Sequence, residues 1–276
     1  MKVPNLKKIL EPTWSHKPGY GWNAEFKELR KQGIKEQATT PEDPLLLKKL
    51  GIKKRDNVLA IATYYASWAS KLKEAGAKVT YSDISKPMVD YVKRTAKIRF
   101  EDYICSNYEL IPQESNKYDW TFTFEACGGH QGLPVAYLRS LFNKKGGILV
   151  LFVNKDKPEN MGGKPKTYPS IVKTLAKIYD TRYSIKKTSI KGHRKGQPTT
   201  FLPHIIYTIR TNNNAREKAS LDIRVLDYID NKRVLHLNRD SKILDIQKKE
   251  LRRSINRLNN LSNLIKSDFI KNIFLE

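Results

Sequence analysis

The amino-acid sequence predicts an α/β fold with an open, mostly parallel sheet, an antiparallel hairpin at one sheet edge and a small helical unit after it. Three observations carry this prediction. Strand-like apolar runs alternate with helical patterns over the first two thirds of the chain. The unbroken apolar run Ile148–Val153 is typical of a central strand in a parallel sheet, which is covered on both faces. The β-rich segments Tyr183–Ser189 and His204–Arg210, joined by a loop, indicate the antiparallel pair.

The elements are expected in a regular order along the chain. Residues 1–42 form a leader, in which the Gly- and Pro-containing segment Trp14–Asn23 predicts an ordered loop with aromatic side chains and Ala24 to about Lys31 predicts a helix. The main unit is residues 43–211. Its expected elements are a helix near Pro44–Leu50, a strand at Val58–Ala62, a helix ending near Gly76, a strand from Lys78 to Asp83, a helix from Pro87 to about Lys97, strands near Tyr103–Ser106 and at Trp120–Phe124, a helix around Pro134–Phe142, the strand after Gly146-Gly147, and a helix at Tyr168–Tyr179.

The polar break Asn212–Asn214 predicts a boundary, and residues 212–276 form the helical C-terminal unit. Helices are expected at Ser220–Asp230, Ser241–Leu244 and Lys248–Leu261. The last two resemble the short helix, turn and longer helix of a helix-turn-helix or winged-helix unit. Leu251, Ile255 and Leu258 share one face, whereas Lys249, Arg253 and Arg257 share the opposite face and are available to phosphates. A dimerisation helix or a substrate-covering cap explains the same pattern equally well.

The composition excludes several classes of protein. A hydrophobic fraction of 39% with 29% charged residues is typical of a soluble globular protein. No apolar run approaches the roughly 18 residues that a membrane helix needs, and the first residues lack the apolar core of a secretory signal. Cys105 and Cys127 form no disulfide framework or metal cluster, and the five histidines are scattered. We therefore expect a cytoplasmic protein with no membrane span and no bound metal.

The charge points to a polyanionic partner. The chain has 52 Lys and Arg against 28 Asp and Glu, a net charge of +24. Such a field favours polyanions, namely RNA, DNA or an anionic membrane surface, although a lysine-rich proteome or a very hot or salty habitat would produce it too. The excess is concentrated, because Lys155–Lys195 holds 12 basic and 3 acidic residues. We expect this segment to bind RNA rather than DNA, with Tyr168 and Tyr183 available for stacking; a solvated loop and helix face is the alternative.

The segment Val58–Ser85 carries the main indication of a ligand. It predicts a strand, a turn, a helix and a second strand that ends at Asp83. An acidic residue about 20 positions after the first turn is where a Rossmann-like unit holds a ribose hydroxyl pair. A nucleoside-containing ligand is therefore the first hypothesis. The structural alternative for Asp83 is an aspartate that caps a helix or a turn.

Over residues 43–211 the chain resembles the class I S-adenosylmethionine-dependent methyltransferases. The matching segments are VLAIATYYASWASKL (Val58–Leu72), YSDIS (Tyr81–Ser85), CSNYELIP (Cys105–Pro112), KYDWTFTFEACGG (Lys117–Gly129) and LRSLFNKKGGILVLFV (Leu138–Val153). The resemblance implies a seven-stranded sheet whose last two strands are antiparallel, and S-adenosylmethionine as the cofactor. It also implies cofactor contacts in the first turn, at the end of the second strand and after the third strand. These candidates are Ala62, Tyr64, Ala66, Asp83, Ile84, Asn107 and Tyr108.

The first turn departs from the pattern of the family. It lacks the glycines that the resemblance calls for, with Ala62, Tyr64 and Ala66 in their places, and Ala60 replaces the usual acidic residue. Glycine would let the backbone approach a ligand and adopt positive φ at low cost. Two interpretations follow: an altered cofactor pocket that still works, which we favour, or a fold that no longer binds the cofactor.

The candidate catalytic residues follow the fourth strand, which by resemblance faces the transferred methyl group. Glu125 could take a proton from an acceptor, and His130 could act as a base. Tyr64, in the first turn, is a third candidate. A buried carboxylate bonded to turn amides and a surface histidine are the structural alternatives. The chain lacks the Asn/Asp-Pro-Pro-aromatic motif of exocyclic-amine methylation and the Pro-Cys or Thr-Cys context of cytosine C5 chemistry.

Three functions remain open at the level of the sequence. We expect a methyltransferase acting on RNA or another polyanion. The second possibility is a small-molecule methyltransferase, whose acceptor would be covered by a lid carrying Trp14, Tyr20 and Trp22. The third is a catalytically inactive protein of the same fold that binds nucleic acid.

Overall fold

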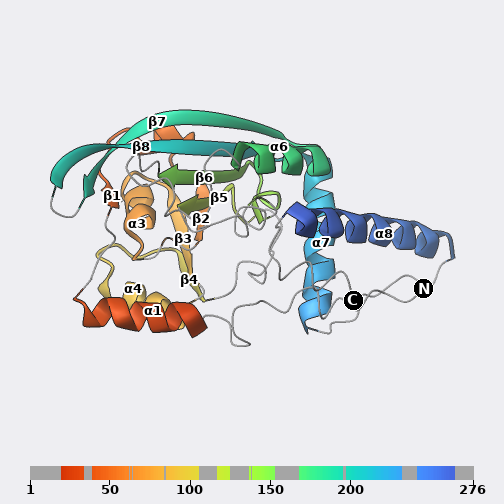
Figure 1. Cartoon of the computed structure of the whole chain (residues 1–276), viewed down its shortest axis with the longest axis horizontal. Coiled ribbons are helices and arrows are strands. Elements are labelled where there is room, and N and C mark those ends of the chain that lie inside the picture. The colour runs from red at the N-terminus through yellow and green to blue at the C-terminus, as the bar shows by residue number, and fades with distance from the viewer. Residues whose placement is uncertain are drawn as a thin grey trace.

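The structure is a computed structural model of the 276-residue chain, and it is built around one mixed sheet (Figure 1). It describes residues 20–33, 39–61, 63, 65–83, 85–105, 117–124, 137, 139–152, 168–194, 197–231 and 241–264. Within these ranges the sheet has eight strands in the order β1-β7-β8-β6-β5-β2-β3-β4.

Five parallel strands form the centre and one side of the sheet. They are, in spatial order, β4 (Asp102–Cys105), β3 (Lys78–Asp83), β2 (Asn57–Ile61), β5 (Trp120–Phe124) and β6 (Gly146–Phe152). The burial of β2 and β5 on both faces explains their nearly continuous apolar sequences. This arrangement confirms the predicted α/β class.

The other side of the sheet is antiparallel. Strand β8 (Gln197–Arg210) pairs with β6, and β7 (Arg182–Arg194) pairs with β8. Both strands are longer than predicted. Only His204–Arg210 of β8 lies against β6. The first half of β8 and the part of β7 paired with it, from Ser189 on, therefore extend past the end of β6.

The prediction of seven strands was one short, because β1 (Thr39–Pro41) adds an eighth at the edge of β7. Three residues of sequence Thr-Thr-Pro carry no alternating apolar pattern, so nothing in the sequence indicated a strand. Asp43 fixes its position: this buried carboxylate accepts hydrogen bonds from the backbone amides of Leu45 and Lys191 at 2.9 and 3.0 Å and pairs with Lys49.

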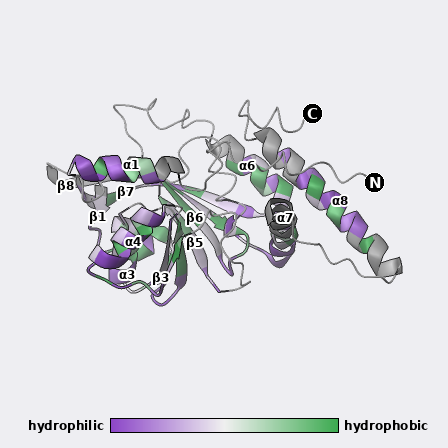
Figure 2. Cartoon of the chain, turned by 90° about the horizontal axis from the view of Figure 1, so that it is seen from below, coloured by the Kyte–Doolittle hydropathy of each residue, from purple (hydrophilic) through white to green (hydrophobic). Residues whose placement is uncertain are grey.

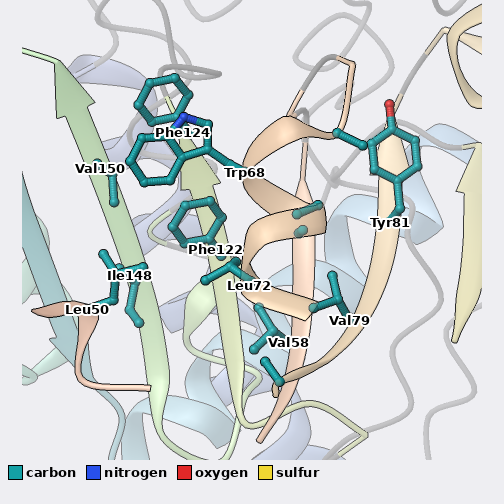
Figure 3. Close-up of a cluster of buried hydrophobic side chains, with 14 of the residues drawn as sticks. Leu50, Val58, Trp68, Leu72, Val79, Tyr81, Phe122, Phe124, Ile148 and Val150 are labelled. Atoms are coloured by element: carbon teal, nitrogen blue, oxygen red, sulfur yellow. The ribbon is translucent and has the colours of Figure 1, made fainter. Parts of the chain in front are cut away.

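Helices cover the sheet on both sides. Helices α2 (Leu46–Leu50), α3 (Ser67–Glu74) and α4 (Lys86–Thr95) follow the expected pattern, as does α6 (Tyr168–Tyr179). Pro87 lies in the first turn of α4, as predicted. The main core packs α2, α3 and α4 against one sheet face. Figure 3 shows its side chains; those labelled are Leu50, Val58, Trp68, Leu72, Val79, Tyr81, Phe122, Phe124, Ile148 and Val150. A smaller cluster of Leu59, Ile61 and Tyr118 lies on the opposite face, as strand alternation requires.

The leader contributes a helix as well as β1. Helix α1 (Tyr20–Lys31) begins four residues before the predicted start, so the end of the expected aromatic loop is helical. It lies beside α4 in Figure 1. Trp14 lies outside the described residues, and the side chains of Tyr20 and Trp22 are not described either. Their predicted role as a lid stays a prediction.

The C-terminal unit differs from the prediction. Helix α7 (Asn213–Asn231) is followed by one continuous helix, α8 (Ser241–Leu264), where a short helix, a turn and a second helix were expected. The helix-turn-helix prediction is therefore wrong, because no glycine or proline interrupts the residues between Leu244 and Lys248. Residues 213–231 and 241–264 contain no wing strand. Figure 2 shows α8 projecting away from the sheet, with hydrophilic residues along it.

A buried carboxylate joins α6, α7 and α8. Asp222 of α7 is fully buried and accepts hydrogen bonds from the Tyr179 hydroxyl at 3.0 Å and from Ser254. Arg257 donates Nε and Nη2 to the same carboxylate at 2.9 and 2.7 Å. The expectation that Arg257 is available to phosphates is therefore wrong, since its guanidinium neutralises Asp222. Lys249 and Arg253 are exposed on α8.

Two further findings concern the described ranges. None of the helices there combines the length and apolar character needed to cross a membrane. The same ranges contain no group of three or more His, Cys, Asp or Glu side chains placed to hold a metal ion.

Candidate functional site

The candidate site lies at the carboxyl edge of the parallel strands. Strand β2 is the point where the strand order reverses, because β3 and β5 flank it on its two sides. In open α/β sheets the crevice outside the carboxyl ends at such a switch point is the usual ligand site. The turns after β2 and β3 are therefore the first places to examine.

One described residue of the turn after β2, Ala66, has a backbone conformation that usually favours glycine. Ala66 has φ 62° and ψ 16°, in the left-handed region, and it precedes α3 directly. Its amide donates to the Thr63 carbonyl at 3.0 Å, and its carbonyl accepts from Ser70 at 2.7 Å. This conformation costs a residue with a Cβ roughly 1–2 kcal/mol. Ala66 therefore adopts the conformation that glycine would adopt at lower cost.

Polar groups around this turn are buried without a partner in the described part of the chain. They include the hydroxyl of Thr63 and the indole N–H of Trp68, and both side chains are fully buried. The Trp68 ring stacks on Phe124, the last residue of β5, with 4.2 Å between centroids (Figure 3). Ala66 gives α3 no side-chain cap. An unpaired buried polar atom costs about 1–3 kcal/mol, so these atoms indicate a place where a ligand or water completes the bonding.

Asp83 ends β3, and its carboxylate helps to shape the next turn. Its side chain is buried, with the residue 7% exposed, and Oδ1 accepts a hydrogen bond from the Ser85 amide at 2.8 Å. Ser85 is the N-cap of α4, with Oγ accepting from the Met88 amide. The structural alternative proposed for Asp83, a turn aspartate, is thus part of its role. The same geometry places Asp83 at the carboxyl edge of the sheet, beside the turn after β2.

Asp83 also sets the electrostatics of this edge. Burial raises the pKa of Tyr81 well above its usual value, and Asp83 adds to the increase. Cys105 on β4 lies opposite Asp83 on β3 in the strand register. Partial burial raises the pKa of its thiol, and Asp83 acts in the same direction. Both groups are neutral near pH 7.

The structure describes only some of the residues predicted from the sequence. Ala66 and Asp83 lie within the described ranges, at neighbouring turns of the carboxyl edge. Seven candidates lie outside the described residues: Ala62, Tyr64, Ile84, Asn107, Tyr108, Glu125 and His130. Thr63, Trp68 and Ser85 were not predicted as site residues. Only Ser85 carried a signal, since Ser followed by Lys-Pro is a typical helix start.

The predicted basic surface is partly described. Residues 153–167, 195 and 196 lie outside the described ranges. The remainder has exposed basic side chains on α6 and β7. These are Lys173, Lys177, Arg182, Lys186, Lys187 and Lys191.

The chain is similar in sequence to one curated protein, over part of its length. No protein-family model matches the sequence. The chain is 28% identical over 153 residues to the mitochondrial 2-methoxy-6-polyprenyl-1,4-benzoquinol methylase of Caenorhabditis elegans, covering 52% of this chain and 48% of that protein. It therefore spans about half the length of the curated relative that it matches.

Solved structures are similar in fold. One comes from a study of the conversion of a disulfide bond into a thioacetal group during echinomycin biosynthesis; it has a TM-score of 0.52 and 11% identity, and the match covers 72% of this chain and 98% of that chain. A TehB-like S-adenosylmethionine-dependent methyltransferase from Corynebacterium glutamicum has a TM-score of 0.42 and 11% identity, covering 69% of this chain and 97% of that chain.

The sheet order, the positions of the two turns and the methylase relative lead to one conclusion. Five parallel strands are followed by an inserted antiparallel strand, β8, and by β7 outside it. The chain has the fold of the class I S-adenosylmethionine-dependent methyltransferases.

Proposed function

We propose that this chain is an S-adenosylmethionine-dependent methyltransferase that acts on RNA or another polyanionic acceptor. The observation that carries the cofactor half is the carboxyl edge. There a left-handed turn at Ala66 leads into an uncapped helix, and a buried aspartate, Asp83, ends the adjacent strand. The residues present fit the cofactor, since they offer a carboxylate for hydroxyl groups and backbone amides for an acidic group.

Each group would hold a different part of the cofactor. The Asp83 carboxylate would accept hydrogen bonds from the ribose hydroxyls. The first amides of α3 would face the carboxylate of the methionine portion, with the Thr63 hydroxyl as a further partner. By sequence, Asn107 would meet the adenine. The cofactor supplies an activated methyl group on a sulfonium, and the protein's task is to position the acceptor and exclude water. Glu125 or His130 would take the acceptor's proton where one must be lost.

The acceptor half of the proposal is supported by the basic β7–β8 ribbon. The ribbon extends past the end of β6, at the same edge of the sheet as Asp83. Lys187 and Lys191 are exposed and share one face of β7, because side chains two positions apart alternate together. Cations beside the cofactor opening would hold a phosphate backbone while one nucleotide enters the site. Lys249 and Arg253 on α8 offer a second basic surface.

Two other functions each have an observation in their favour. The methylase relative acts, by its name, on a polyprenyl benzoquinol, which favours a small-molecule acceptor. The alanines and the tyrosine in the first turn favour a protein that binds nucleic acid without the cofactor. Cofactor binding and salt-dependent RNA binding separate the three.

Calorimetric titration with S-adenosylmethionine and S-adenosylhomocysteine tests the cofactor half. We expect micromolar binding that Asp83→Ala weakens at least tenfold, about 1.4 kcal/mol. Asp102→Ala is the matched control, because Asp102 is an exposed aspartate at the opposite end of the neighbouring strand. Absence of binding by the intact protein would exclude a working cofactor site and leave the inactive, nucleic-acid-binding function.

RNA binding measured over a range of salt concentrations tests the acceptor half. We expect the Lys187→Ala/Lys191→Ala variant to bind single-stranded RNA more weakly and with a salt dependence shallower by about 1.4, or about 0.7 per phosphate contact. The control is Arg94→Ala/Lys97→Ala, which removes the same charge from exposed positions near α4. Equal effects of the two variants would argue against a specific surface. Methyl transfer to a benzoquinol without RNA binding would support the small-molecule function.

A further inference from the structure

Helix α1 contacts both turns of the proposed cofactor site, although it lies about 40 to 60 residues earlier in the chain. Phe26 is buried and packs against Tyr65, which lies in the first turn one residue before Ala66, with 6.1 Å between ring centroids. Phe26 also packs against Tyr91 of α4 at 5.6 Å. The Tyr65 and Tyr91 rings meet edge to face at 5.8 Å. One aromatic cluster therefore joins α1, the first turn and α4.

The second contact is a hydrogen-bond relay to Asp83. The Ser85 hydroxyl donates to Asn23 Oδ1 at 2.8 Å. The Ser85 amide donates to Asp83 Oδ1, also at 2.8 Å. Asn23 is half-buried at the start of α1, so its side chain connects that helix to the turn which carries Asp83.

Arg30 holds the far end of α1 in place. Its guanidinium lies over the Tyr91 ring, with Cζ 4.6 Å from the ring centroid, and Nη1 donates to the Tyr91 hydroxyl at 3.2 Å. Burial raises the pKa of Tyr65, partly offset by Arg30, so this phenol is neutral near pH 7. Helix α1 is thus fixed at Asn23, Phe26 and Arg30, on the side that faces α4 and the two turns.

We propose that α1 is an integral wall of the cofactor site, and that Asn23 is a positioning residue that acts through Ser85 on Asp83. The inference rests on the proposed function, since it assigns a role in holding S-adenosylmethionine. The physical reason lies in the first turn, where Ala66 occupies a costly left-handed conformation. Packing from α1 through Phe26 and Tyr65 stabilises that turn, and the Asn23 relay fixes the orientation of the Asp83 carboxylate.

The test compares Asn23→Ala with Lys27→Ala, an exposed position on the same helix. S-adenosylhomocysteine affinity should fall about threefold to tenfold in Asn23→Ala, the range that loss of one neutral hydrogen bond produces. Lys27→Ala should bind like the intact protein. Unchanged affinity in Asn23→Ala, with normal binding by the intact protein, would overturn the inference and leave the proposed function standing. No binding by the intact protein would overturn both.

A double-mutant cycle separates positioning from a merely structural role. If Asn23 acts through Asp83, adding Asn23→Ala to Asp83→Ala should cause no further loss of affinity for S-adenosylhomocysteine. Independent effects would instead multiply, and that result would contradict the relay.

Hydrogen exchange gives a second readout: bound S-adenosylhomocysteine should slow exchange of the amides in 20–31. Exchange in 20–31 that does not change on binding would show that α1 is no part of the site.

Discussion

The two edges of the parallel sheet differ in how many of their buried polar side-chain atoms have a hydrogen-bond partner among the described residues. At the amino edge, Asp56 precedes β2 and is 6% exposed. It accepts hydrogen bonds from the Lys53 amide at 3.0 Å, from Trp120 Nε1 at 2.8 Å and from Lys145 Nζ at 2.6 Å. The chain itself supplies every one of these donors. The result is a carboxylate saturated by its own protein.

At the carboxyl edge the chain supplies fewer partners. Thr63, Trp68 and Ser82 are fully buried, and each has a polar side-chain atom without a hydrogen-bond partner among the described residues. At the amino edge, the hydroxyl of Tyr118, before β5, also lacks a partner among the described residues. The two edges therefore differ in the number of such atoms. Saturated groups stabilise the fold, whereas unsatisfied buried groups reduce stability and are retained where they bind something. Substitutions at the two edges should therefore affect different quantities.

The largest effect is expected at the amino edge, for Gly146→Ala. Gly146 has φ +127°, and a Cβ there would lie 1.8 Å from the Ile209 carbonyl oxygen. Backbone strain and overpacking together should lower the free energy of unfolding by about 4 kcal/mol, measured by urea denaturation. Gly51→Ala is the control, because Gly51 has φ +77° and nothing within 4 Å of the added Cβ. If the two variants were equally destabilised, the close approach of β6 and β8 would be wrong.

Asp222→Ala tests the other saturated carboxylate of the molecule. Removing it leaves the half-buried Arg257 guanidinium and the buried Tyr179 hydroxyl without their acceptor. We expect the free energy of unfolding to fall by about 3 kcal/mol and the affinity for S-adenosylhomocysteine to stay unchanged. Glu217→Ala, at an exposed site on α7, should change neither quantity. A loss of affinity in Asp222→Ala would mean that the C-terminal helices take part in the cofactor site.

Asp56→Asn should cost about 2 kcal/mol at pH 7, because it removes the charge that faces Lys145. Burial raises the pKa of Asp56, but hydrogen bonds from Lys145, the Lys53 amide and Trp120 outweigh burial and leave the pKa below its usual value of 3.8. A lowered pKa in the folded state contributes stability above pH 3.8, and that contribution disappears as the pH falls toward the folded-state value. The difference between the two proteins, measured by urea denaturation from pH 7 to pH 3, should shrink below about pH 4. A difference independent of pH would exclude the ionic contribution.

The fold could be predicted from local patterns wherever those patterns were strong. The bounds of β5 and α6 agree with the predictions because an apolar run and a helical periodicity end there at clear polar positions. The length of β8 was missed because Pro198 and Pro203 indicate a loop, yet pairing with β7 holds this stretch extended. Tertiary pairing decided this element, and no local signal reports it.

The site could be predicted only where spacing along the chain determines it. Asp83 follows from its distance to the first turn, because strand and helix lengths fix that geometry. The partner of Ser85 could not be foreseen, since Asn23 lies 62 residues away. Trp68 carried no signal either, since the environment of its indole N–H depends on how α3 packs against Phe124. Contacts between distant segments are visible only in the structure.

Thr63→Val tests the carboxyl edge directly. Valine has nearly the shape of threonine and removes a buried hydroxyl that has no partner in the described ranges. We expect the free energy of unfolding to stay the same or to rise by up to about 1 kcal/mol, while S-adenosylhomocysteine affinity falls about threefold to tenfold. Thr63→Ser keeps the hydroxyl and should retain the affinity. A Thr63→Val variant that is less stable and binds normally would place this hydroxyl with the saturated groups of the amino edge.

The smallest effect is expected for Ala66→Gly, and it has the opposite sign. Ala66 has φ 62°, a conformation that glycine adopts without the penalty from Cβ. Glycine also has more freedom in the unfolded chain, which offsets part of the gain, so the net increase in unfolding free energy should be about 0.5 kcal/mol. Ala69→Gly, inside α3, is the control and should lower stability by about 1 kcal/mol. Urea denaturation resolves the opposite signs. If both glycines destabilised the protein, the left-handed turn at Ala66 would be wrong, and with it the evidence that the turn keeps its shape without glycine.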